Sequence, residues 1–454
     1  MISNRNPWSW LVPAIAALAA AAFYAAIFYP GTIGFDSAYQ WWQARGGETS
    51  NVHGIGMIWF WRLSDAASQG PAFLFMLQLA LFWCGLALVA VSLPTRQIWR
   101  LAFLLAAGLS PIPFVVLSSV LSDAVMMAAL CCALGICVCA LGRGGRAPFL
   151  LVMFLLFSAM LVRKNALPAV IPLAIFACWR EFPVMRTGLV RCVLAGSCIG
   201  IAMLGTDTLL QRRVDHPMTL FAGTAVWDLA AISIATGDLL LPPSIHGPDL
   251  DVADLRQAFV PYTNTTIFAN THADMAQPFF DPDDPRNGEI RRAWLDAIAS
   301  HPGTYLAHRW RLTRALFGSK QHDWPRELVY FPGNTQYRDN PPVAVNGSRL
   351  HAMFDGWIDA SRGSVLFAPW PYVLLALVAG LQAWRRRENP QAQAALATLA
   401  SGLLYAAPLP LIAPSAELRY LAWPCIAAVL GAALTLAASP LTSAAHATTL
   451  RAPF

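Results

Sequence analysis

The chain has 454 residues, of which 57% are hydrophobic and only 12% are charged. Soluble globular domains carry about 25% charged residues, so this composition excludes an ordinary soluble protein and predicts several membrane-spanning helices. The net charge of +6 does not indicate a nucleic-acid partner, because most of the basic excess lies in short loops between apolar runs, where membrane topology explains it.

Hydropathy predicts an all-α polytopic membrane protein with about ten transmembrane helices, each formed from roughly 20 apolar residues. The predicted spans are residues 8–29, 72–93, 100–118, 122–141, 147–162, 165–180, 188–207, 366–384, 393–412 and 420–438. The first run is long for the apolar part of a secretory signal, so we expect it to be retained as a span. The chain then divides into an N-terminal membrane domain (1–207), a mainly helical or irregular external segment (208–365) and C-terminal membrane helices (366–454).

Basic residues in the loops predict the orientation. If the spans alternate, one side of the membrane receives most of the arginines, which makes that side cytoplasmic. These are Arg5, Arg96, Arg100, Arg143, Arg146, Arg180, Arg186, Arg191, Arg385, Arg386 and Arg387. The other face then receives the loop 30–71 and the external segment. In a bacterium this arrangement corresponds to an inner-membrane protein whose functional face is periplasmic.

The loop after the first span places Asp36 at the membrane edge, where an ionisable group is costly to desolvate and usually has a function. We expect two short interfacial helices, one over 37–45 and one over 55–63, with His53 between them. The alternatives are that Asp36 only caps a helix N-terminus and that His53 is only an interfacial polar residue.

Three cations are predicted on this same external face, where topology disfavours them: Arg163, Lys164 and Arg419. The alternatives are that Lys164 snorkels to lipid headgroups and that Arg419 is paired with Glu417. Asp123 opens the fourth span, where N-capping is again the alternative.

The external segment is rich in Pro, Asp, Asn and His, and its best helical stretch, 288–317, is broken near His301-Pro302. Asp281 and Asp283 form an Asp-x-Asp triplet, but the adjacent prolines favour a turn over a metal site. No metal ligand is predicted. No cofactor is firmly indicated, and a divalent cation remains open.

Several short motifs on one predicted face resemble the GT-C superfamily of integral-membrane glycosyltransferases, which use polyprenyl-phosphate-linked sugars. They are the Asp36 loop with His53-Gly54, Leu121-Ser122-Asp123-Ala124, Arg163-Lys164-Asn165-Ala166-Leu167-Pro168, His301-Pro302-Gly303-Thr304-Tyr305-Leu306-Ala307-His308-Arg309 and Glu417-Leu418-Arg419-Tyr420-Leu421. The chain departs from the family in having one Asp in the first loop, Gly-Ile-Gly after His53, and its large segment before the last three spans. The subfamily and the sugar therefore stay open.

The resemblance implies an inverting hexosyl- or pentosyltransferase of the cell envelope. Asp36 would be the general base, with His53 and Asp123 orienting it or the acceptor, and Arg163, Lys164 and Arg419 would bind the donor phosphate. The acceptor or sugar would be held by residues of the first loop and of the start of the last span, namely Tyr39, Gln40, Trp42, Glu417 and Tyr420. Expected partners are a lipid-linked sugar donor, a glycan, lipid or protein acceptor, and membrane lipids.

Three other interpretations remain open at this level. A transporter or flippase could use the same cations to bind a lipid-linked or anionic substrate, although transporters place polar groups nearer the middle of spans. An O-antigen-ligase-like transferase would use a diphosphate-linked donor. A non-catalytic membrane scaffold would use the external segment for binding.

Overall fold

The computed structural model describes residues 8–140, 146–182, 184–185, 188–270 and 273–438, and every regular element in these ranges is a helix. Six helical segments are long and apolar enough to cross a membrane, which confirms a helical membrane protein. They are α1 (Trp8–Phe28), α4 (Ala72–Ser92), α7 (Ser122–Cys139), α10 (Leu189–Gln211), α19 (Pro390–Ala406) continued by α20 (Leu409–Ile412), and α21 (Ala422–Ala437) preceded by η7 (Leu418–Leu421).

The other four predicted spans are shorter or bent helices, so the count of about ten stays a prediction. The predicted span 100–118 is a pair, α5 (Gln97–Gly108) and α6 (Pro111–Leu117), bent by 60°. Pro111 and Pro113 explain the bend, because proline lacks a backbone donor and restricts the residue before it. The remaining three are α8 (Arg146–Val162), α9 (Leu167–Glu181) and α18 (Trp370–Arg385).

Helix α7 forms the centre of the bundle, with 89% of its most apolar window buried. It lies against α4 at two glycines. A Cβ atom added at Gly135 would come within 2.7 Å of the Gly85 carbonyl oxygen, and one added at Gly85 would come within 2.5 Å of the Cys131 backbone. Small residues at this crossing let the two backbones approach closely, as in many membrane helix pairs.

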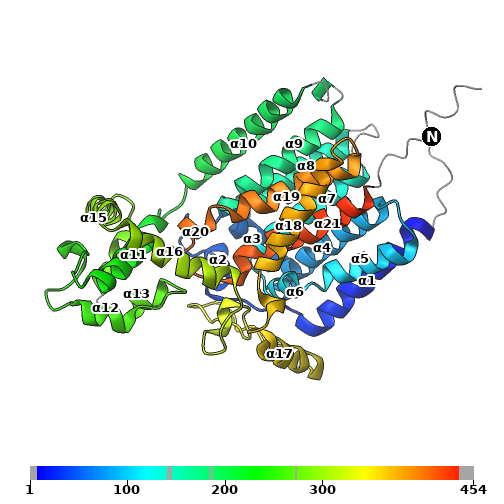
Figure 1. Ribbon diagram of the computed structural model, residues 1–454. Coiled ribbons are helices and arrows are strands. Elements are labelled where there is room, and N and C mark those ends of the chain that lie inside the picture. Colours follow the sequence, from blue (N-terminus) through cyan, green and yellow to red (C-terminus); the bar gives the residue numbers. More distant parts are fainter. Residues whose placement is uncertain (1–7, 141–145, 183, 186–187, 271–272, 439–454) are drawn as a thin grey trace, which may run out of the picture.

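Residues 208–365, here called the intervening segment, form a group of helices at one end of the bundle (Figure 1). Its apolar helix α11 (Leu220–Thr236) is contacted by α12 (Val252–Ala258), α14 (Gln277–Phe280), α15 (Arg286–Ser300) and α16 (Pro302–Phe317). The predicted break at His301-Pro302 is confirmed, since α15 ends at Ser300 and α16 begins at Pro302. Helices α13 (Thr265–Asn270) and α17 (Arg349–Ser361) complete the segment.

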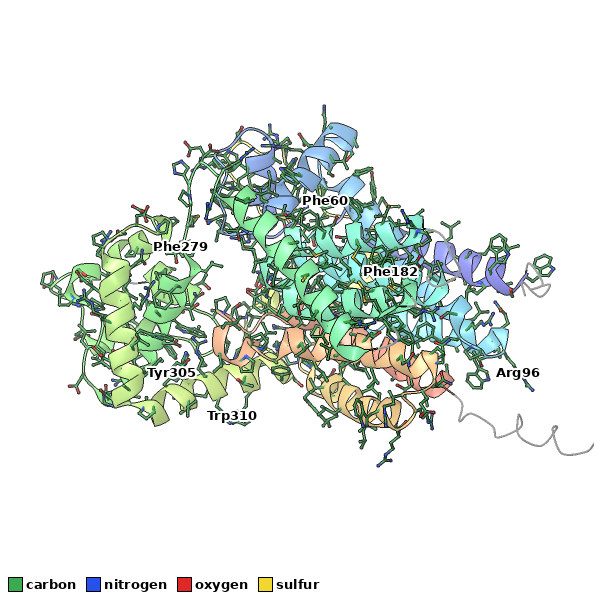
Figure 2. The ribbon with its side chains drawn as sticks, turned by 90° about the horizontal axis from the view of Figure 1, so that it is seen from above. Phe60, Arg96, Phe182, Phe279, Tyr305 and Trp310 are labelled. Atoms are coloured by element: carbon green, nitrogen blue, oxygen red, sulfur yellow. The ribbon has the colours of Figure 1, made fainter. Side chains whose placement is uncertain are left out.

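We call the end of the bundle that faces this segment the segment end. Helix α1 finishes there, and α4, α7 and α21 begin there (Figure 1). Figure 2 places Arg96 at the opposite end of the molecule from Phe279 and Tyr305 of the intervening segment, and the predicted orientation in the membrane stays a prediction. Arg5, Arg143 and Arg186 lie outside the described residues.

The first loop folds as two helices packed on the segment end, α2 (Phe35–Ala44) and α3 (Ile55–Ser68). The buried indole rings of Trp41 and Trp61 stack with centroids 5.7 Å apart and join the two helices. The Ser37 hydroxyl donates to the Val120 carbonyl oxygen at 2.5 Å, which fixes the first turn of α2 beside the start of α7. Asp36 therefore lies directly next to the N-terminal end of the central helix.

Candidate functional site

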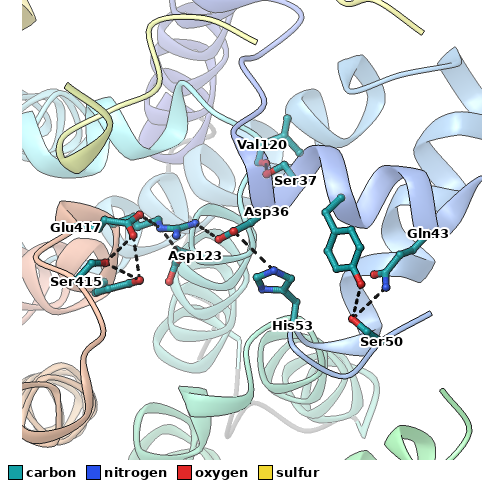
Figure 3. A network of polar contacts seen from close by, with 12 residues as sticks. Asp36, Ser37, Gln43, Ser50, His53, Val120, Asp123, Ser415 and Glu417 are labelled. Carbon is teal, nitrogen blue, oxygen red and sulfur yellow. Dashed lines mark hydrogen bonds and ion pairs between the residues drawn. The ribbon is translucent and has the colours of Figure 1, made fainter. Parts of the chain in front are cut away.

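Five carboxyl and guanidinium side chains from four separate parts of the chain meet at the segment end, and Figure 3 shows Asp36, Asp123 and Glu417 among them. We call them the ionic cluster: Asp36, Asp123, Arg163, Glu417 and Arg419. The sequence analysis proposed all five as site residues, and the fold brings them together.

Arg419 is the centre of the cluster. Its Nη1 lies 2.7 Å from Asp36 Oδ2, and its Nε lies 2.5 Å from Glu417 Oε2 and 3.9 Å from Asp123 Oδ2. The guanidinium of arginine is a rigid fork with several donors, so one arginine can hold several carboxylates at fixed angles. The pairing with Glu417 that the sequence suggested is present, and it is only one of three contacts.

Asp123 has no exposed surface and lies between two guanidinium groups. Its Oδ1 is 3.0 Å from Arg163 Nε, and its Oδ2 faces Arg419. The N-cap position of helix α7 is occupied by Leu121, and no side chain forms a capping hydrogen bond there. The alternative that Asp123 is an N-cap is therefore wrong. Burial of a carboxylate requires paired charge, which here comes from Arg163 and Arg419.

Asp36 is the most accessible carboxylate of the cluster, with 28% of its side chain exposed. It is not a helix cap either, because Gly34 occupies the N-cap position of α2. Burial alone would raise the pKa of the Asp36 carboxyl, but the positive charges of Arg419 and Arg163 hold that pKa well below its usual range. Asp36 is therefore ionised at neutral pH.

His53 lies on the far side of Asp36 from Arg419, with Nε2 3.8 Å from Asp36 Oδ1 (Figure 3). Burial lowers the pKa of the His53 imidazole below its usual value, although Asp36 opposes this, and the nearby Arg163 lowers it further. The imidazole is therefore neutral at neutral pH. The resemblance to GT-C enzymes left the partner of Asp36 open, and the geometry gives it two partners, Arg419 and His53.

Tyr420 extends the cluster with a hydroxyl group. The Ser415 hydroxyl donates to Glu417 Oε1 at 2.7 Å and lies 3.1 Å from the Tyr420 hydroxyl, which also donates to Glu417 Oε1 at 3.2 Å. The guanidinium carbons of Arg163 and Arg419 lie 5.3 and 5.4 Å from the Tyr420 ring centroid. Glu417 is thus held by groups on both of its carboxylate oxygens.

Lys164 is not a member of the ionic cluster, although it neighbours Arg163 in the sequence. Its Nζ donates to the Asn51 carbonyl oxygen, in the loop that carries His53. Burial lowers the pKa of the Lys164 ammonium below its usual value, while Asp207 opposes this. The lysine positions the His53 loop and lies near His53 rather than beside Arg419.

The predicted acceptor residues of α2 lie on the same helix as Asp36. Gln40 is one turn away from Asp36 and is buried, and neither atom of its amide has a hydrogen-bond partner in the described part of the chain. Tyr39 and Trp42 stack with ring centroids 6.1 Å apart, and Tyr39 lies 6.4 Å from the His53 ring. A buried amide without a partner is a group on which a ligand hydroxyl would form hydrogen bonds.

The sequence analysis missed the segment that covers the cluster. Phe331 lies against Gly34, where an added Cβ would come within 2.5 Å of its ring, and its ring centroid is 6.0 Å from the Arg419 guanidinium carbon. Tyr337 contacts both Tyr39 and Trp42. Only aromatic residues flanking the turn Pro332-Gly333-Asn334 marked this segment in the sequence, and their distance along the chain hid the contact.

The turn before Arg419 is also held by the intervening segment. The Ala416 amide donates to the Tyr262 carbonyl at 2.8 Å, the Asn264 amide donates to the Pro414 carbonyl at 3.0 Å, and Arg309 Nη1 donates to the Ala413 carbonyl at 3.1 Å. Arg309 in turn pairs with the fully buried Asp228, with Nη2 2.6 Å from Oδ2. The sequence analysis named Arg309 only as the last residue of the motif that begins at His301, and it did not single out Asp228.

The Asp-x-Asp triplet forms the predicted turn. Asp281 Oδ1 accepts a hydrogen bond from the Asp283 amide at 2.9 Å, and Asp284 pairs with Arg286 at 2.6 Å. Among the residues that the structure describes, no three His, Cys, Asp or Glu side chains are arranged to hold a metal ion.

The ionic cluster contains three carboxyl groups and two guanidinium groups. An anion that approaches Arg419 meets carboxylates already placed at two of its nitrogens, Nη1 and Nε. No protein-family model, curated protein or solved structure among those compared matches this chain. The chemistry assigned to the cluster depends on its own geometry.

Proposed function

We propose that this protein is an integral-membrane glycosyltransferase that moves a sugar from a polyprenyl-phosphate donor to an acceptor hydroxyl. The observation that carries the proposal is the meeting of a partly exposed carboxylate, Asp36, with the guanidinium of Arg419 at a distance of 2.7 Å. Such a pair supplies both a base for a hydroxyl group and a cation for a leaving phosphate.

The donor phosphate engages Arg419 by exchanging partners. The guanidinium of an arginine can form a bidentate contact with a phosphate, and Asp36 is the most exposed of the partners of Arg419. When the phosphate takes the place of Asp36, the carboxylate loses the cation that stabilises its ionised form, so it becomes a stronger base. Donor binding thereby activates Asp36 for the acceptor, and Asp123 keeps Arg163 and Arg419 in position.

The chemical step is a single displacement with inversion. The acceptor oxygen forms a bond to the anomeric carbon of the sugar, while the bond from that carbon to the phosphate oxygen breaks. The acceptor proton moves to Asp36, and the phosphate leaves with the bonding electron pair beside Arg419. A phosphate is a good leaving group, so this transfer needs one carboxylate, whereas glycoside hydrolysis uses two.

The test is Asp36→Asn in a membrane-inserted, folded preparation that is supplied with a radiolabelled polyprenyl-phosphate sugar. Loss of the base predicts a decrease in transfer of about 10²- to 10⁴-fold. Asp339→Asn is the matched control, because Asp339 is 77% exposed and contacts only Arg45 in the described ion pairs. Transfer by Asp36→Asn at the rate of this control would contradict the role of Asp36.

A flux measurement separates the enzyme from the transporter. Proteoliposomes that contain the wild-type protein should form labelled glycosylated product on one face. Movement of the labelled lipid across the bilayer without product would favour the transporter or flippase, in which Arg419 serves only to bind the phosphate.

A further inference from the structure

Helix α17 (Arg349–Ser361) contacts the protein through apolar and acidic side chains, since Ile358 is fully buried and the Phe354 ring lies 5.5 Å from that of Phe114. Asp355 Oδ1 lies 3.0 Å from Arg326 Nη2 and also accepts from the Tyr330 hydroxyl. Asp359 Oδ1 lies 3.1 Å from Arg326 Nε and 3.2 Å from Arg362 Nε. The acidic side chains of α17 are thus used to attach the helix to the rest of the intervening segment.

The outer face of α17 is apolar, and of its two large side chains only Trp357 has a ring contact outside the helix in the described part of the chain, with Phe367 at 5.8 Å between centroids. Met353 is 69% exposed and Trp357 is 41% exposed. The other exposed positions after the first turn are small, namely Ala352, Gly356 and Ala360. A surface helix in water carries charged and polar side chains on its outer face. None of these exposed positions of α17 carries a charge, which indicates that the outer face meets an apolar environment.

The location of α17 identifies that environment. The helix lies beside the end of α1 (Figure 1), with Phe354 6.1 Å from Phe23 and His351 Nδ1 3.1 Å from the Ile27 carbonyl oxygen. Phe23 on α1 is 44% exposed, and Trp370 at the start of α18 is 47% exposed. The apolar face of α17 is therefore continuous with the exposed apolar sides of a membrane-spanning helix and of α18.

We propose that α17 is an interfacial helix that binds the bilayer surface at the segment end, with Met353 and Trp357 inserted at the boundary between headgroups and acyl chains. Aromatic and flexible apolar side chains favour this boundary, and a helix of this kind lies in the plane of the membrane. The proposal does not depend on the glycosyltransferase activity.

This contact also bears on the ionic cluster. Arg326 and Tyr330 form contacts with Asp355 of α17 and lie just before Phe331 in the chain. Phe331 in turn covers Gly34 and Arg419. A helix held at the membrane surface holds this cover at the depth of the bilayer headgroups, where a phosphate attached to a lipid is located.

The test is photo-crosslinking of the full chain in nanodiscs of phosphatidylcholine and phosphatidylglycerol. p-Benzoylphenylalanine is incorporated in place of Met353, whose exposure leaves the packing of α17 intact. The matched control carries it in place of Leu295, an apolar side chain of α15 that is 52% exposed. After irradiation, intact-mass spectrometry should show a gain of one phospholipid for the position-353 variant and none for the position-295 variant.

Two outcomes would overturn the proposal. Equal lipid adducts at the two positions would show that the outer face of α17 does not select the bilayer. A crosslinked species of twice the mass at position 353 would show that this face binds a second copy of the chain.

Discussion

Arg419 is the residue on which three carboxylates converge, and each has a different exposure. Asp123 is fully buried, Glu417 is 18% exposed and Asp36 is 28% exposed. Because the cost of releasing a carboxylate decreases as its access to water increases, Asp36 is the partner that a ligand displaces most easily. The geometry of this one arginine thus separates a structural acid, Asp123, from a proposed reactive one, Asp36.

The ionisation of Asp36 predicts the acid side of the pH profile. The low pKa of Asp36 means that its base form persists as the pH falls, so kcat/KM, which reports the free enzyme, should show no loss from Asp36 between about pH 8 and pH 5. In Arg419→Gln the pKa of Asp36 rises, and the acid limb of kcat/KM should move to higher pH. Profiles measured with the radiolabelled donor check this, and identical acid limbs in both proteins would contradict the pairing.

Protonation of His53 is a second contribution that the same profiles can separate. The depressed pKa of His53 places its protonation below its usual pH range, so any residual acid limb in the wild type should disappear in His53→Asn. A limb that persists in His53→Asn would have to belong to another group.

The pairing of Asp123 with Arg163 predicts coupled stabilities. Asp123→Asn leaves a buried guanidinium without its nearest partner, which should lower the free energy of unfolding by about 3–5 kcal/mol. Arg163→Gln should have a similar cost, and the double variant should cost less than the sum by about 1–3 kcal/mol. Unfolding in detergent measures all three, and additive costs would show that the two side chains do not interact.

At the scale of elements, the turn between α20 and η7 leads into Glu417 and Arg419 of the ionic cluster but is held from outside the membrane bundle. Residues 262 and 264 form hydrogen bonds with residues 416 and 414, and Arg309 of α16 contacts the Ala413 carbonyl oxygen. Arg309 is itself fixed by Asp228 of α11, which also accepts from the Trp294 indole at 2.9 Å. The intervening segment therefore positions Glu417 and Arg419 without contributing a charge to the ionic cluster.

Arg309→Met should loosen this turn. The variant removes the hydrogen bond to the Ala413 carbonyl oxygen and takes away the guanidinium that pairs with the buried Asp228 carboxylate. The backbone amides of Asn264 and Ala416 should therefore exchange hydrogen faster than in the wild type. Transfer activity should fall as well, because Arg419 loses its fixed position. Arg311→Met is the control, since Arg311 is exposed on the same helix. Unchanged exchange at both amides would contradict the positioning role.

At the scale of the whole molecule, the bundle depends on the close approach of α4 and α7, because α7 carries Asp123 and α4 begins beside the first loop. Gly85 and Gly135 allow this approach, and a side chain at either position would meet backbone atoms within 3 Å. Backbone atoms cannot move aside as a flexible side chain can, so larger residues must separate the helices.

Gly135→Val should therefore destabilise the protein by about 1–3 kcal/mol or more. Gly205→Val on α10 is the matched control, because an added Cβ there meets nothing within 4 Å and the position is exposed. Thermal unfolding in detergent compares the two variants. An equal loss of stability in both would show that the destabilisation comes from helix propensity rather than from the α4–α7 contact.

The amino-acid sequence alone predicted the helical membrane class, the two helices of the first loop, the break at His301-Pro302 and the identity of the five charged residues of the ionic cluster. These features follow from local composition, because hydropathy, helix breakers and charges at membrane edges are properties of short stretches of chain. Only the tertiary structure decided the pairings: Asp36 and Asp123 bind guanidinium groups rather than capping helices, and Lys164 faces Asn51. It also brought Phe331, Arg309 and α17 to the segment end. Contacts between residues hundreds of positions apart depend on how the helices pack, and no local pattern in the sequence encodes that packing.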